Sequence, residues 1–188
     1  MRNLVLIVFA IVCILVVSVV VVLLNTAPGY EVTRSATIEA PAASVFAHVA
    51  SPRRWHGWAV WTTAGHPDVT VTYDGPESGL GARSKWNAPS GNGRLEITRS
   101  EEPETLEFEL RVEGLPPAGG SITLAPGGVT VTGAGEKVTV TRVTVTVSGE
   151  VDDHVFLRAM KALGRIEAIL GAQLEESLDR LKSATERG

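Results

Sequence analysis

Residues 156–181 read FLRAMKALGRIEAILGAQLEESLDRL, and their pattern decides the fold. Apolar residues recur every three or four positions, as they do along one face of an α-helix. They are Phe156, Leu157, Met160, Leu163, Ile166, Ile169, Leu170, Leu174, Leu178 and Leu181. Asp152 or Asp153 can cap this helix, which we expect to run to about Thr185 and to be about 45 Å long. A helix of that length must lie across a wide apolar surface.

Two glycines, Gly164 and Gly171, lie on one side of the expected helix. A glycine inside a helix costs about 1 kcal/mol, so a local reason for each is expected. Two reasons stay open, namely close approach to a sheet and room for a ligand.

The residues before this helix predict a curved antiparallel sheet. In the stretch 105–113, Leu106, Phe108 and Leu110 alternate with charged residues, which is typical of a half-buried antiparallel strand. Further strands are expected at 31–39, 69–73, 82–87, 94–99, 121–125 and within the valine- and threonine-rich stretch 129–151. In that last stretch the apolar residues change from even-numbered to odd-numbered positions. This change predicts a β-bulge near Thr141 and Arg142.

Two short helices are expected between the first strands. Pro41 suits the start of a helix over 42–49, and Ser51 with Pro52 can cap and open a second helix over 53–58. The order of elements therefore predicts an α+β domain over residues 30–188.

The segment from Leu4 to Leu24 has 21 residues, of which only Ser18 is not apolar. As a helix it would span about 31 Å, which matches the apolar thickness of a bilayer. A cleaved signal peptide fits less well, because its apolar region is shorter and ends in a small-residue site that Asn25-Thr26-Ala27 does not supply. We therefore expect residues 1–29 to form a transmembrane anchor and a linker.

Arg2 before the segment and Arg34 after it give the only basis for its orientation. The positive-inside rule favours the amino end in the cytoplasm. The expected location is the cell membrane, crossed once, with the domain on the extracytoplasmic side.

Charge and cysteine content exclude some classes of protein. The net charge of −4 offers no basic excess for binding nucleic acid. The single cysteine, Cys13, cannot form a disulfide within the chain.

Several ordered motifs resemble a known family. They are APAASVF at 40–46, the tryptophan-rich SPRRWHGWAVW at 51–61, GPESGLGARSKW at 75–86, GNG at 91–93 and LDRLK at 178–182. Together they resemble the helix-grip fold of the START/Bet v 1-like superfamily, and more closely the bacterial SRPBCC proteins of the polyketide cyclase/dehydrase and lipid transport type. The resemblance covers about residues 30–186. It departs from the family at Leu174, where a bulkier residue is frequent, and in the glycine-rich stretch from Gly127 to Gly135.

The resemblance implies a curved sheet wrapped around the long helix, with a cavity between them that holds an apolar ligand. The residues that we expect to contact the ligand are Trp55, Trp58, Trp61, Trp86, Phe108, Leu110, Met160, Leu163 and Leu174. For the tryptophans at 55–61, a structural plug between a short helix and the sheet is an equal alternative.

No catalytic set follows from the motifs. The four histidines lack metal-ligand spacing, so neither a metal nor a cofactor is expected. His56, between Trp55 and Trp58, is the candidate catalytic residue, because burial can shift the pKa of a histidine. A carboxylate in the pocket is the alternative acid/base group.

Three hypotheses about function remain. The first is a membrane-anchored module that binds a lipid or another hydrophobic small molecule. The second is a cyclase/dehydratase-like enzyme, and the third is an interaction module that recruits a partner protein to the membrane. The sequence leaves the oligomeric state open.

Overall fold

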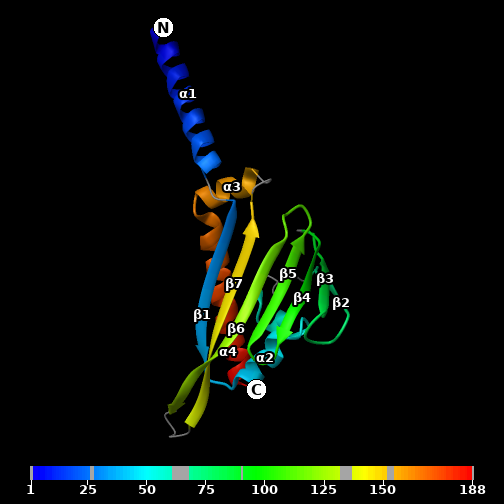
Figure 1. The fold of residues 1–188 in the computed structure, drawn as a ribbon. Coiled ribbons are helices and arrows are strands. Elements are labelled where there is room, and N and C mark those ends of the chain that lie inside the picture. Colours follow the sequence, from blue (N-terminus) through cyan, green and yellow to red (C-terminus); the bar gives the residue numbers. More distant parts are fainter. Residues whose placement is uncertain are drawn as a thin grey trace.

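One antiparallel sheet and the helices on its inner face organise the domain (Figure 1). The computed structural model describes residues 2–25, 28–60, 68–89, 91–131, 137–151 and 155–187. Within them, the seven strands are ordered β1-β7-β6-β5-β4-β3-β2. The strands are β1 Gly29–Ile38, β2 Thr70–Asp74, β3 Arg83–Asn87, β4 Gly93–Glu101, β5 Thr105–Val112, β6 Ala118–Val131 and β7 Lys137–Glu150. The helices are α1 Arg2–Asn25, α2 Ala42–Val49, the short 3-10 helix η1 Arg54–Gly57, α3 Val155–Ala162 and α4 Arg165–Glu186.

Helix α4 lies against the inner face of the sheet, where it packs on β1, α2 and η1. Arg34 on β1 reaches over α4, and its Nε donates a hydrogen bond of 2.6 Å to Oε1 of Glu175. Gly171 lies beneath this guanidinium, and a Cβ there would overlap it. Of the two reasons left open for Gly171, the structure therefore supports close approach to the sheet.

The core forms where alternate strand residues meet the helices. Its members on α2 and α4 follow the helical period that the sequence predicted, for example Val45 and Val49, and Leu174 and Leu178. The sheet contributes buried residues from every second position, such as Leu106 and Phe108 on β5. This arrangement confirms the α+β class, the curved antiparallel sheet and the C-terminal helix across it.

The prediction of one unbroken helix to Thr185 is wrong at Gly164. There the backbone is left-handed, with a φ of 65°, and the Gly164 amide donates to the carbonyl of Lys161 at 2.8 Å. A glycine in this conformation ends a helix, because a Cβ disfavours it. Helix α3 therefore stops at Ala162, and α4 starts as a separate helix at Arg165.

The bulge predicted near Thr141 lies on the neighbouring strand. Pro126 pairs with Thr141 and Gly128 with Val140, so Gly127 is the extra residue on β6. Val140 and Thr141, which lie opposite this bulge, are successive residues of β7 and are both buried. The predicted strand at 121–125 is part of this much longer β6, and the second short helix is a 3-10 helix.

The transmembrane segment predicted from Leu4 to Leu24 is not supported by the structure. In the part of the chain that the structure describes, no helix meets the combined requirements of length and apolar character for crossing a membrane.

Candidate functional site

Two of the predicted ligand contacts, Trp55 and Trp58, lie in the packed core. Each is 1% exposed. The indole N–H of Trp55 donates to the carbonyl of Val49 at 2.7 Å, which fixes η1 against α2. The Trp55 ring meets the Phe108 ring edge-on, with centroids 5.0 Å apart. This packing agrees with the structural-plug interpretation.

Phe108 and Leu174 are buried in the same cluster, from the sheet side and the helix side. Their predicted contact with a ligand stays a prediction. Trp61, the third tryptophan of the predicted set, lies outside the described residues.

The packing loosens toward the other end of the sheet. Along β5, Leu106 and Phe108 are buried, whereas Leu110 and Val112 are only half-buried, although all four lie on the inner face. Four apolar residues around this end are partly exposed and pack against the core. They are Tyr30, Trp86, Leu110 and Leu170, and we call them the apolar rim.

Strand register aligns two of the rim residues across the sheet. Tyr30 pairs with Gly149, Gly149 with Ala118, and Ala118 with Leu110, so these four residues form one row across four strands. The two residues in the middle of the row are small. Burial raises the pKa of the Tyr30 hydroxyl, so this group stays uncharged at neutral pH.

Three aromatic rings on the inner face each lie over a glycine of the adjacent strand. The pairs are Tyr30 over Gly149, Trp86 over Gly93 and Phe108 over Gly120. A Cβ on any of these glycines would overlap the ring. The glycines therefore let the rings lie close to the sheet.

Helices α3 and α4 bring further apolar residues to this end. Met160 is half-buried, Leu163 is 76% exposed and Ile169 is 44% exposed. Of the residues predicted to contact a ligand, Trp86 and Leu110 therefore lie at the rim. Met160 and Leu163 lie on the α3 side. The other predicted residues that the structure describes lie in the core.

His56 lies apart from the apolar rim, on η1. Its ring meets the Tyr73 ring edge-on at 5.9 Å, and the Arg53 guanidinium covers the same tyrosine at 4.3 Å from the ring centroid. Burial lowers the pKa of His56, so the neutral form is favoured at neutral pH. Burial also raises the pKa of Tyr73, an effect that the charge of Arg53 opposes. A polar hollow of about 420 Å³ adjoins Arg53 and Tyr73, and His56 is not among its lining residues.

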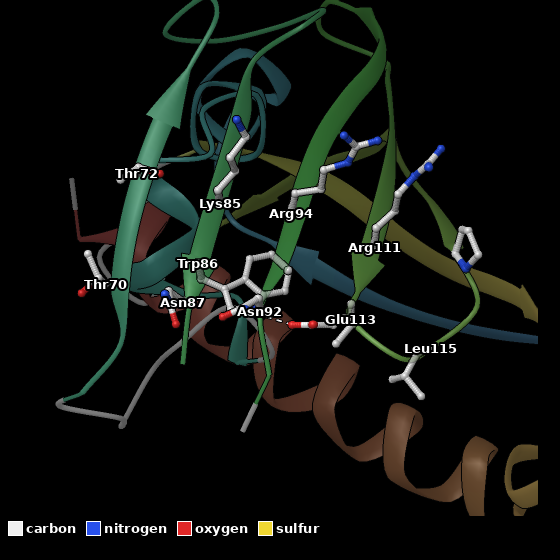
Figure 2. A pocket seen from close by; sticks show the side chains of 13 residues that line it. Thr70, Thr72, Lys85, Trp86, Asn87, Asn92, Arg94, Arg111, Glu113 and Leu115 are labelled. Carbon is white, nitrogen blue, oxygen red and sulfur yellow. Dashed lines mark hydrogen bonds between the residues drawn. The ribbon is translucent and has the colours of Figure 1, made fainter. Parts of the chain in front are cut away.

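A larger groove, of about 910 Å³, lies over strands β2 to β5 (Figure 2). Lys85, Arg94 and Arg111 line it, one from each of three neighbouring strands. Their positions alternate with the buried Ser84 and Leu95, which places them on the outer face of the sheet. Sequence reasoning missed this row, because only the strand register brings the three residues together.

A comparison with models of known protein families finds one that matches most of this chain. The model described as "Polyketide cyclase / dehydrase and lipid transport" matches residues 30–186. The chain belongs to this family.

Solved structures share the fold of this polyketide cyclase/dehydrase and lipid transport family member at low sequence identity. A protein from Chromobacterium violaceum is 13% identical, with a TM-score of 0.55 and coverage of 83% of this chain and 96% of the other. A protein from Arthrobacter aurescens is 18% identical, with a TM-score of 0.55 and coverage of 84% and 87%. Truncated norcoclaurine synthase from Thalictrum flavum is 11% identical, with a TM-score of 0.52 and coverage of 83% and 92%. No curated protein matches the chain.

Membership of the family agrees with the fold described above and confirms the family that the motifs resemble. Fold alone does not fix a chemistry, so the function must be argued from the site.

Proposed function

We propose that this protein binds a hydrophobic small molecule, such as a lipid, between the inner face of its sheet and helices α3 and α4. The observation that carries the proposal is the loss of packing along β5, from buried Leu106 and Phe108 to half-buried Leu110. Family membership supports the same class of ligand.

The chemistry of the rim suits an apolar guest. Its side chains are aromatic or aliphatic, and Ala118, which lies next to Leu110 in the row, carries only a methyl group. Removing apolar surface from water is worth about 25 cal/mol per Å², so an apolar molecule that covers these side chains gains affinity from their burial. The Tyr30 hydroxyl can supply one hydrogen bond for orientation.

A substitution that fills the rim tests the proposal. In the full chain, Leu110→Trp places a large side chain among the rim residues, whereas Leu80→Trp makes the same change at an exposed position in a turn. Native mass spectrometry with oleic acid as the probe should detect a one-to-one adduct in the unmodified chain and in Leu80→Trp. We expect Leu110→Trp to reduce the adduct about tenfold or more.

Equal adduct levels in the two variants, or no adduct in the unmodified chain, would refute the proposal. Because Leu110→Trp can also disturb folding, Trp86→Ala provides a second variant, which removes apolar contact instead of adding volume. Thermal unfolding of each variant identifies those that remain folded.

We further propose that α1 attaches the protein to the cell membrane, with the domain on the extracytoplasmic side. The support comes from the sequence, since 20 of the 21 residues from Leu4 to Leu24 are apolar. Helix α1 has 24 residues, and its described apolar side chains, including Phe9 and Leu15, are exposed. Exposed apolar surface on this scale needs an apolar environment.

Membrane extraction tests the attachment. Val12→Asp combined with Val16→Asp adds two charges that are each costly inside a bilayer, by about 3 kcal/mol. We expect this variant to appear in the soluble fraction after alkaline washing, and Val129→Asp, a change on β6, to remain with the membranes. Retention of both variants would contradict the proposal, and a topology reporter fused after Gly188 tests the orientation.

An enzyme of the cyclase/dehydratase kind is the second candidate. It rests on His56, which is held in its neutral form beside Tyr73 and is therefore suited to accept a proton. If a substrate turns over, His56→Ala should lower kcat by about a hundredfold. Unchanged turnover in that variant would remove His56 from any catalytic role.

A further inference from the structure

The outer face of the sheet carries a row of three cations across neighbouring strands. Lys85 pairs directly with Arg94, and Arg94 pairs directly with Arg111. Side chains at such positions have Cβ atoms about 5 Å apart, and like charges directly opposite each other destabilise a sheet. The arrangement therefore requires an explanation.

The adjacent row combines both signs of charge. There Asp74 pairs with Arg83, Arg83 with Glu96, and the Arg83 Nη2 donates to Oε1 of Glu96 at 2.9 Å. Opposite charges thus lie next to each other from Asp74 to Glu96. Glu96 also pairs directly with Glu109, so this row ends in two like charges that lie two residues along β4 and β5 from Arg94 and Arg111. The cation row has no acidic member.

Neighbouring carboxylates compensate the row only in part. Arg111 forms an ion pair with Glu109, and Lys85 lies 4.0 Å from Asp74, at the limit of an ion pair. Among the described residues, Arg94 in the middle forms no ion pair. Hydrogen bonding by Arg111, with a smaller contribution from the charge of Arg94, lowers the pKa of Glu109, which shows the positive field of the row.

The groove over this row has the donors and the size for an anion (Figure 2). Its volume is about 910 Å³, and Thr70 and Thr72 bring hydroxyl groups to its β2 side. Asn87 adds an amide, while Trp86 and Leu115 belong to the same lining. Glu113 adds one carboxylate, whose Oε2 accepts a hydrogen bond of 2.9 Å from the side-chain amide of Asn92. Guanidinium and ammonium groups with hydroxyl donors are the groups that bind phosphate oxygens.

We propose that this groove binds a phosphate-bearing anion through Lys85, Arg94 and Arg111. The bound phosphate supplies the negative charge that the row lacks. A lipid headgroup and a free phosphate compound share this chemistry. The three cations lie on the opposite face of the sheet from Leu110, although Trp86 belongs both to the lining of this groove and to the apolar rim.

Calorimetric titration of the full chain in phosphatidylcholine nanodiscs tests the site, with inorganic pyrophosphate as the probe. We expect saturable binding that weakens about tenfold in Arg94→Gln, because one charge-assisted contact is lost. The matched control is Arg142→Gln, which removes an exposed arginine from the outer face of β7. We expect the control to bind pyrophosphate like the unmodified chain.

Nanodiscs that contain phosphatidic acid distinguish the two sources of phosphate. One supporting outcome is that pyrophosphate binds saturably in phosphatidylcholine nanodiscs and that this binding is lost when phosphatidic acid is present. That outcome shows that a lipid headgroup competes for the site. Pyrophosphate binding that phosphatidic acid leaves unchanged supports the site with a free compound. Absence of saturable binding, or equal weakening in Arg94→Gln and Arg142→Gln, overturns the proposal.

Thermal unfolding measured without phosphate shows whether a variant has a folding defect. Arg94→Gln removes one of three like charges, so we expect its Tm to be equal to or above that of the unmodified chain. A lower Tm would contradict the inference that the cations oppose each other in the empty groove.

Discussion

Single aromatic residues determine how the helical segments of this domain meet its sheet. Trp55 combines a buried ring, an edge contact with Phe108 and one hydrogen bond to the carbonyl of Val49. The sequence showed that tryptophans cluster here, but it left a plug and a pocket mouth equally open. The packing of Trp55 and Trp58 agrees with the plug. The sequence could not separate the two interpretations, since both require apolar residues at these positions.

Trp55→Phe tests this assignment. The variant keeps an aromatic ring but leaves the buried carbonyl of Val49 without its donor, so we expect the free energy of unfolding to fall by about 1–3 kcal/mol. Urea unfolding measures the change. Trp86→Phe, at the half-buried rim, provides the comparison and should cost less; an equal loss would argue against a special role for the Trp55 hydrogen bond.

His56 should make stability depend on pH. Its pKa is lowered by burial from the ordinary value of 6.5, so the unfolded chain takes up a proton at a higher pH than the folded protein does. The contribution of His56 to stability is therefore complete above about pH 6.5 and is lost as the pH falls below that value. We expect His56→Gln to reduce this loss when urea midpoints are compared from about pH 7.5 to about pH 5.5.

His48→Gln controls for the removal of a histidine elsewhere, since His48 contacts the carbonyl of Ser44 on α2. If His56→Gln and the unmodified chain lose stability equally over this range, His56 does not titrate as its burial implies.

Helices and strands differ in how well their sequence predicts them. The bounds of α2 agree with the pattern over 42–49, because a short amphipathic helix after Pro41 has clear local signals. The break between α3 and α4 was missed, since the apolar spacing continues through Leu163 and Gly164 while the backbone does not. The change of apolar phase predicted a bulge on β7, whereas the extra residue, Gly127, lies opposite on β6.

Gly164→Ala tests the break between the helices. A Cβ in the left-handed region should lower the free energy of unfolding by about 1 kcal/mol. Gly57→Ala is the matched control, because a Cβ at Gly57 meets no atom within 4 Å and its φ is not in the left-handed region. We expect that control to stay within about 0.5 kcal/mol of the unmodified chain in urea unfolding. A stabilised Gly164→Ala would mean that α3 and α4 can join into one helix.

At the scale of the whole molecule, β3, β4 and β5 present two faces of different chemistry. Their inner residues include Trp86 and Leu110, and their outer residues include Arg94 and Arg111. The sequence predicted the inner face through the apolar alternation and the family motifs. It could not predict the cation row, because cross-strand register depends on how strands far apart in the sequence align.

The two faces should bind their ligands independently. We expect the affinity for pyrophosphate, measured in the nanodiscs described above, to be the same for the unmodified chain and for Leu110→Trp. The reason is that successive residues of a strand point to opposite sides of the sheet. A change in affinity of more than about threefold, which corresponds to about 0.6 kcal/mol, would indicate coupling between the faces.

The rings that lie over glycines restrict how this sequence can change during evolution. A mutation that gives Gly93 a side chain displaces the Trp86 ring, and the same holds for Gly120 with Phe108 and for Gly149 with Tyr30. Each glycine and its ring should therefore be inherited as a pair. Relatives that carry a side chain at one of these glycines should carry a smaller residue in place of the ring, so substitutions at the two positions should be correlated across the family.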